Sequence, residues 1–186
     1  MEAILISFFV VAIAEIGDKT QLLAIVLASR FKRPLAIIGG ILSATIVNHL
    51  VAATGGFYLA NLLEGFWFRL AVAISFLAMG AWALVPSKTN VESAISNRGA
   101  YLATLLGMFV LEIGDKTQVA TVALAARFHS VLLVATGTTL GMLAADIPAV
   151  FLADRATTLV PLQYVRAVAA LIFLALGVWG LVELHR

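Results

Sequence analysis

The chain has 186 residues, of which 62% are hydrophobic and 12% charged, and its mean hydropathy is +1.07. In a soluble domain about a quarter of the residues are charged, so the composition excludes a soluble globular protein and indicates an integral membrane protein. The net charge is only +2 and gives no basic patch for nucleic acid, and the absence of cysteine excludes disulfides, thiolate metal sites and thiol catalysis.

Six apolar segments follow one another along the chain, and each is long enough for a membrane-spanning helix, which needs about 20 residues. The first begins Met1-Glu2 without a basic region and holds a polar motif at its centre, so we expect a retained helix and not a signal peptide. The expected fold class is therefore an all-α integral membrane protein with six transmembrane helices. The predicted segments are residues 3–29, 34–60, 67–86, 100–126, 131–153 and 163–184.

The two halves of the chain are copies of one unit. The seven-residue string Glu-Ile-Gly-Asp-Lys-Thr-Gln occurs at Glu15–Gln21 and again at Glu112–Gln118. An offset of 97 residues also aligns, without any insertion, Arg30 with Arg127, Gly40 with Gly137, Arg69 with Arg166, Gly80 with Gly177 and Trp82 with Trp179. A duplication of this kind predicts that both halves share one fold.

Three helices in each copy is an odd number, so the second copy must enter the membrane from the opposite side. This predicts two inverted-topology repeats of three helices each. The expected domains are a first repeat over residues 1–86, a connecting loop over 87–99 and a second repeat over 100–186.

The distribution of basic residues predicts the orientation. If the N-terminus lies outside the cytoplasm, seven basic residues fall on the inner side and three on the outer side. By the positive-inside rule, both termini are then expected outside the cytoplasm. The inner residues are Arg30, Lys32, Arg33, Lys88, Arg98, Arg155 and Arg166, and the outer ones are Arg69, Arg127 and Arg186.

The repeated motif places ionisable groups in the middle of apolar segments. Glu15 and Glu112 are each the thirteenth residue of their segment, so both motifs are expected near the membrane midplane. On a continuous helix Glu15, Asp18 and Lys19 share one side, and a turn that is polar on nearly every side cannot face lipid. The axis of an inverted repeat passes through the same depth. Four carboxylates are therefore predicted to converge on one central site: Glu15, Asp18, Glu112 and Asp115.

Oxygen ligands without sulfur suit a hard divalent cation such as Ca²⁺ or Mn²⁺. At Gly17 and Gly114 the helices could approach one another closely, or break and free carbonyl oxygens for a ligand. Lys19 and Lys116 leave the four carboxylates with a net charge of minus two if all are ionised, which one divalent ion neutralises. Four further motif side chains could add neutral oxygens or hold the carboxylates in place: Thr20, Gln21, Thr117 and Gln118.

Clustered carboxylates at low dielectric cannot all stay ionised once the cation has left, so protons are expected to occupy the empty site. Competition between two protons and one divalent cation for the same carboxylates is a sufficient physical basis for antiport. We expect no cofactor. The expected partners are the transported Mn²⁺ or Ca²⁺, protons and the lipid bilayer, with no nucleic acid.

The halves differ at two neighbouring positions where specificity could enter: Asn48-His49 in the second segment aligns with Ala145-Asp146 in the fifth. Asp146 is predicted to be a fifth acidic group near the site, whereas Asn48 and His49 could supply a further ligand or a proton relay. The alternative for His49 is an ordinary interhelical hydrogen bond. Because imidazole suits transition metals better than Ca²⁺, His49 favours Mn²⁺.

Other functions are compatible with parts of the pattern. Glu15 and Lys19 are four residues apart, as are Glu112 and Lys116, so the motif could be a self-neutralising clamp between the halves, but that would leave two aspartates unneutralised. An acidic centre could also serve a cation channel, or an exporter of an amino acid or another small organic solute. The chain has no nucleotide-binding loop and no nucleophile, base and oxyanion arrangement, so neither an ATP-driven pump nor an enzyme is predicted. The sequence does not predict an oligomeric state.

The paired Glu-x-Gly-Asp-Lys-Thr strings, with three helices each, resemble the Ca²⁺:cation antiporter-2 family, which includes Golgi calcium/manganese proton exchangers and bacterial manganese exporters. The resemblance covers nearly the whole chain, and both motif copies are complete. It implies export of Mn²⁺, or of Ca²⁺ in some members, in exchange for protons, with Glu15, Asp18, Glu112 and Asp115 as cation ligands. We expect the chain to be without the long hydrophilic loop and the N-terminal targeting region of many organellar relatives, so it is expected to be more similar to bacterial plasma-membrane members.

Overall fold

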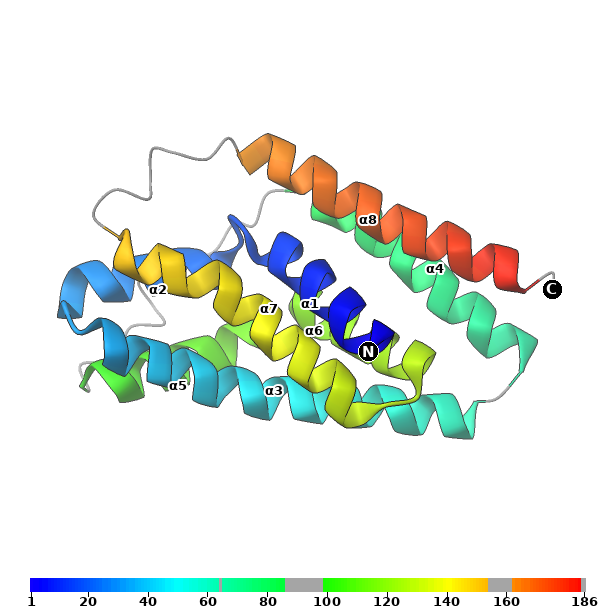
Figure 1. The fold of residues 1–186 in the computed structure, drawn as a ribbon, viewed down its shortest axis with the longest axis horizontal. Helices are drawn as coiled ribbons and strands as arrows, with labels where there is room; N and C mark the ends of the chain where they lie inside the picture. Colours follow the sequence, from blue (N-terminus) through cyan, green and yellow to red (C-terminus); the bar gives the residue numbers. More distant parts are fainter. Residues whose placement is uncertain (64, 86–98, 154–161, 185–186) are drawn as a thin grey trace.

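The computed structural model describes residues 1–63, 65–85, 99–153 and 162–184 (Figure 1). Within these ranges the chain is all-helical, as predicted, and three of its helices, α3, α4 and α7, are long and apolar enough to cross a membrane. The eight helices are α1 (Glu2–Glu15), α2 (Lys19–Phe31), α3 (Pro34–Leu62), α4 (Phe66–Ala83), α5 (Ala100–Glu112), α6 (Lys116–Phe128), α7 (Val131–Phe151) and α8 (Leu162–Glu183).

The predicted segments 3–29 and 100–126 are not continuous helices, because each breaks inside the repeated motif. Gly17 and Gly114 adopt φ angles of 76° and 72°, which lie in the left-handed region where glycine has no steric penalty. A right-handed helix cannot continue through such a residue. The prediction of one helical turn that carries the motif on one side is therefore wrong, and the alternative, a break at the glycine, is the one that forms.

The same motif residue stabilises both breaks. The backbone N–H of Gly17 donates a hydrogen bond to Gln21 Oε1 at 2.8 Å, and the N–H of Gly114 donates one to Gln118 Oε1 at 2.6 Å. These bonds satisfy backbone donors that the broken helix leaves without a partner. The identical strings thus form identical local structure, which explains why the glycine and the glutamine occur together in both copies.

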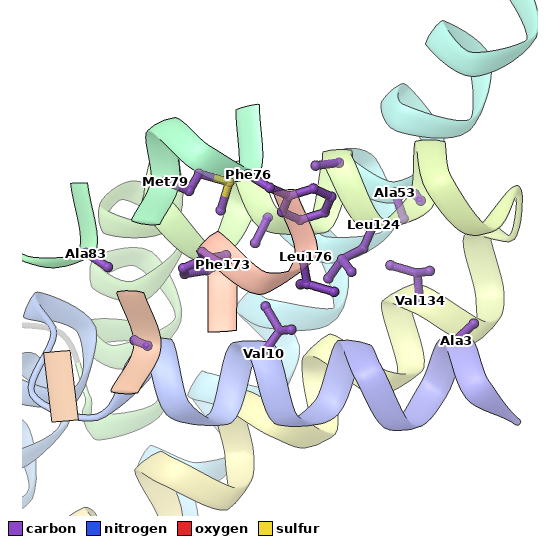
Figure 2. Packing of buried hydrophobic residues seen from close by; sticks show 14 of the residues in the cluster. Ala3, Val10, Ala53, Phe76, Met79, Ala83, Leu124, Val134, Phe173 and Leu176 are labelled. Atoms are coloured by element: carbon purple, nitrogen blue, oxygen red, sulfur yellow. The ribbon is translucent and has the colours of Figure 1, made fainter. Parts of the chain in front are cut away.

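The helices form a central bundle with one helix pair beside it (Figure 1). In the bundle, α1 packs along α7, and α3 packs against α5, α6 and α7. The helices α4 and α8 pack mainly on each other and form the lateral pair. Phe76 on α4 and Phe173 on α8, each 1% exposed, join this pair to the bundle near Val10 and Leu124 (Figure 2).

Close contacts between the two halves are reciprocal. A Cβ at Gly80 would lie 2.9 Å from Leu174 Cγ, and a Cβ at Gly177 would lie 2.5 Å from Leu77 Cδ2. Residues 80 and 177, like residues 77 and 174, are 97 positions apart, so the two contacts are the same contact with the halves exchanged. This is the pattern expected when two copies of a unit face each other across a two-fold axis.

Part of the predicted topology lies outside the described residues. The parts concerned are the connecting loop 87–99 except for Gly99, the basic residues Lys88, Arg98, Arg155 and Arg186, and the side chain of Arg166. The orientation in the membrane and the domain boundaries therefore stay predictions.

Candidate cation site

Carboxylates from both motifs meet at the centre of the bundle. One ligand oxygen from each of Glu15, Asp18 and Asp115 lies within 4.8 Å of the other two. All three residues are buried, with exposed fractions of 0%, 4% and 2%. Calcium–oxygen distances are about 2.3–2.6 Å, so two oxygens separated by up to about 5 Å can contact the same ion. The three carboxylates are therefore close enough to bind one cation together.

The motif lysines pair across the two motifs. Lys19 Nζ lies 3.1 Å from Asp115 Oδ1, and Lys116 Nζ lies 3.7 Å from Asp18 Oδ1. A self-neutralising clamp would require ion pairs between the glutamate and the lysine of one motif. The ion pairs described here instead join the lysine of one motif to the aspartate of the other. The arrangement explains why both copies need an aspartate next to a lysine: each side chain neutralises its counterpart in the other half.

Helix ends add to the electrostatics of the site. Asp18 and Asp115 occupy the positions immediately before α2 and α6, so the positive ends of two helix dipoles point at the centre. Glu15 and Glu112 are the last residues of α1 and α5, where carbonyl groups lack helical partners. Broken helices supply such termini at the midplane of many transporters, where they bind ions.

Glu112 lies apart from the group of three and is held by α3. Thr45 Oγ1 donates a hydrogen bond to Glu112 Oε1 at 2.9 Å, and Asn48 Nδ2 donates one to Oε2 at the same distance. Both carboxylate oxygens thus accept a hydrogen bond from a neutral side chain of α3. Thr45 was not a candidate from sequence, although it lies one helical turn before Asn48, and the i, i+3 spacing was the available signal.

Glu15 has a different environment from its counterpart. Thr20 Oγ1 donates a hydrogen bond to Glu15 Oε1, and Thr117 Oγ1 donates one to Asp115 Oδ2 at 3.1 Å. The motif threonines therefore hold carboxylates in place, one of the two predicted roles. The motif glutamine oxygens are occupied by backbone N–H groups, whereas Gln21 Nε2 donates to the carbonyl of Ala145 on α7 at 3.0 Å.

Asp146 and His49 occupy equivalent positions on α7 and α3 and are both buried. Neither oxygen of Asp146 has a hydrogen-bond partner among the described residues, and the carboxylate lies within electrostatic range of Glu15 and Glu112. Thr139 Oγ1 is 3.5 Å from His49 Nδ1, and Nε2 has no partner within the same part of the chain. Asp146 thus adds a further acidic group to the centre, while His49 lies within electrostatic range of Asp115.

Buried carboxylates from two copies of one motif, paired with lysines at broken helices inside an apolar bundle, define a secondary transporter of cations. The comparison with known families gives the particular kind. The chain belongs to the divalent cation/proton antiporter GDT1 family, whose sequence model matches residues 3–91 and 100–186. This confirms the family expected from the paired motifs and the exchange of a divalent cation for protons.

Individual relatives agree with the family assignment. The chain is 43% identical over 178 residues to a protein named "Putative manganese exporter" from Vibrio cholerae, which covers 95% of this chain and 89% of that protein. It is 39% identical over 72 residues to GDT1-like protein 4 of Arabidopsis thaliana, covering 39% of this chain and 31% of that protein. GDT1-like protein sll0615 of Synechocystis is 28% identical over 141 residues, covering 62% and 66%. No solved structure matches the chain significantly.

Proposed function

We propose that the chain exports Mn²⁺ in exchange for protons, with Glu15, Asp18 and Asp115 as the central cation ligands. The observation that carries the proposal is the approach of these three carboxylates, contributed by both motifs, to within 4.8 Å of one another. Oxygen ligands suit Mn²⁺ and Ca²⁺ alike. The imidazole of His49, within electrostatic range of Asp115, and the 43% identity to the Vibrio protein both favour Mn²⁺.

The lysines compete with the cation for the two aspartates. In the structure each aspartate of the site has a lysine partner, so an arriving cation must displace ammonium groups from Asp18 and Asp115. Five carboxyl groups, those of the two motifs and Asp146, lie with only two lysines, so the surplus acidic groups can take up either a divalent cation or protons. Glu112 and Asp146 are acidic neighbours of the ligands. The threonines and glutamines of both motifs hold the ligands in position.

The membrane arrangement that fits this function has six crossings, in which α1 with α2 and α5 with α6 each form one broken span. The reciprocal glycine contacts and the lysine–aspartate pairs that exchange between the halves support two inverted repeats, over residues 1–86 and 100–186 with the loop 87–99 between them. The positive-inside rule puts both termini outside the cytoplasm. We assign the protein to the bacterial plasma membrane, by analogy with the Vibrio relative.

The test of this function is metal uptake into proteoliposomes that contain the purified protein, an imposed pH gradient and an internal pH dye. Mn²⁺ movement is expected to be matched by proton movement in the opposite direction and to stop when the gradient is dissipated. Protein-free vesicles are the control. Mn²⁺ flux that is indifferent to the pH gradient would contradict coupling, and coupled flux of Ca²⁺ with none of Mn²⁺ would contradict the choice of metal.

Replacing Asn48 with alanine is expected to lower Mn²⁺ transport about 10- to 100-fold, because a buried acceptor next to the site that loses its donor costs about 1–3 kcal/mol. Asn48 Nδ2 holds Glu112 Oε2, and without it that oxygen loses its donor inside the bundle. The same proteoliposome assay measures the effect. Asn61→Ala is the matched control, since Asn61 lies on the same helix and is exposed. Equal rates for both variants would show that the Asn48 hydrogen bond does not contribute to transport.

A further inference from the structure

A cavity of about 810 Å³ lies between α4, α6 and α8. No residue of either motif lines it, so it is separate from the cation site. Its inner walls are apolar and include Val72, Phe76 and Leu176. Its charged lining comes from Arg69, Arg127, His129 and Glu183.

The charged and apolar parts lie at different depths. Arg69 is in the first turn of α4, Arg127 is in the last turn of α6, and Glu183 ends α8. Phe76 is seven residues further along α4 than Arg69, which is roughly 10 Å at 1.5 Å per residue. The charged residues Arg69, Arg127 and Glu183 form one end of the cavity, which we call its mouth. Trp67, two residues before Arg69, is 79% exposed, as expected for an aromatic side chain at the membrane–water boundary. The cavity is therefore polar at the membrane surface and apolar towards the hydrocarbon.

The charge of the mouth excludes one occupant and favours another. With His129 neutral, two arginines and one glutamate leave a net charge of plus one among the lining residues. Arginines on the path would repel a divalent cation, so this cavity is unsuited to be its route. A phosphodiester carries one negative charge and accepts the bidentate hydrogen bonds that a guanidinium donates.

The two arginines are held differently. Arg127 Nη1 pairs with Glu183 Oε2 at 2.8 Å, and its guanidinium carbon lies 4.1 Å from the centre of the Trp179 ring, so this cation is fixed in place. The Nε atom of Arg127 is buried and has no hydrogen-bond partner among the described residues. Arg69 is exposed and has no ion pair within that part of the chain, which leaves its guanidinium available to a ligand.

We propose that this cavity is a binding site for an anionic phospholipid. The phosphodiester lies at Arg69 and Arg127, and one acyl chain extends along Val72 and Phe76 towards Leu176. A phospholipid has the same order of charged and apolar parts as the cavity, at the same depths, and it neutralises the charge of the mouth. The lipid bridges the lateral pair, α4 and α8, to α6, which begins at Lys116 of the cation site.

The experiment is native mass spectrometry of the purified full chain in detergent, titrated separately with phosphatidylglycerol, phosphatidylcholine and inorganic phosphate. Both lipids carry the phosphodiester, but phosphatidylcholine also brings a quaternary ammonium close to two arginines, so retention of one phosphatidylglycerol is expected at about tenfold lower concentration than retention of phosphatidylcholine. Arg69→Gln should abolish this preference. Val72→Trp fills the cavity and should abolish retention of both lipids.

Arg30→Gln is the matched control. Arg30 is the counterpart of Arg127 in the first half, and each lies over the ring of the phenylalanine that follows it. The guanidinium carbon is 5.5 Å from the ring centre for Arg30 and 5.9 Å for Arg127. Arg30 does not line the cavity. This variant should bind lipid as the unsubstituted chain does. Equal losses in Arg30→Gln and Arg69→Gln would mean non-specific attraction, and undiminished lipid binding in a folded Val72→Trp variant would place the lipid elsewhere. Binding of inorganic phosphate as strong as that of phosphatidylglycerol would assign the site to a soluble anion. Each of these three outcomes would overturn the proposal.

Discussion

Replacing Asp18 or Asp115 with asparagine is expected to reduce proton-coupled Mn²⁺ transport on the order of 100-fold or more, which corresponds to about 2.7 kcal/mol or more. Each change removes a carboxylate oxygen from the group of three and removes the acidic member of an ion pair with a lysine of the other motif. Loss of one member of a buried ion pair is itself costly, because the remaining charge stays desolvated. Metal flux and internal pH, recorded together in proteoliposomes, measure the rate of transport and its coupling to protons.

The two variants should fail to the same extent, because Asp18 and Asp115 come from different motifs but serve one site. Glu2→Gln is the control, since Glu2 is an exposed carboxylate in the first turn of α1. A large loss in one aspartate variant with normal transport in the other would contradict a site shared by both halves. Unchanged proton coupling in Asp18→Asn would contradict the assignment of this carboxylate to the exchange.

Replacing Gly56 with alanine is expected to destabilise the protein by about 1–3 kcal/mol, the usual cost of overpacking. A Cβ at Gly56 would clash with the carbonyl oxygen of Val122 and lie 2.9 Å from its carbonyl carbon, and these backbone atoms cannot rotate away. The helices α3 and α6 must separate to admit the methyl group. Because α3 also holds Glu112 through Thr45, transport should fall together with stability. Thermal unfolding in detergent measures the first effect.

Gly55→Ala provides an adjacent control on the same helix. A Cβ at Gly55 meets nothing within 4 Å, so this change should be neutral or should stabilise α3 by up to about 1 kcal/mol through higher helix propensity. The comparison separates steric contact from the general effect of replacing a glycine. Similar melting temperatures for the two variants would contradict the close approach of α3 and α6 at Gly56.

Much of the architecture follows from the sequence. A polar motif in the middle of an apolar stretch has to be enclosed by protein, because lipid offers its charges no hydrogen bonds or counterions. The repetition of that motif at a constant offset then predicts two similar halves with acidic groups between them. The predicted spans 34–60 and 131–153 agree closely with α3 (Pro34–Leu62) and α7 (Val131–Phe151), because uninterrupted apolar segments leave a helix as the available structure.

The details of the site could not be predicted because they depend on which neighbours the fold brings within a few ångströms. Helical periodicity placed Glu15, Asp18 and Lys19 on one side of a single helix, but the left-handed conformation of Gly17 ends that helix after Glu15. Local spacing suggested a pair between Glu15 and Lys19, whereas the described ion pair joins Lys19 to Asp115, almost a hundred residues away. Pairing across such a distance in the chain leaves no local signature.

The sequence by itself determined the class of protein, the two copies of the motif and the residue types of the site, since these depend on hydrophobicity and on the cost of burying charge. Only the tertiary structure decided which charges pair, that Thr45 and Asn48 hold Glu112 while Glu15 is left to Thr20, and that a cavity forms beside α4. Identical motifs acquire different surroundings because α3 and α7 differ at the positions that face them. A side chain's partners are fixed by packing between helices, which the order of residues along one helix does not specify.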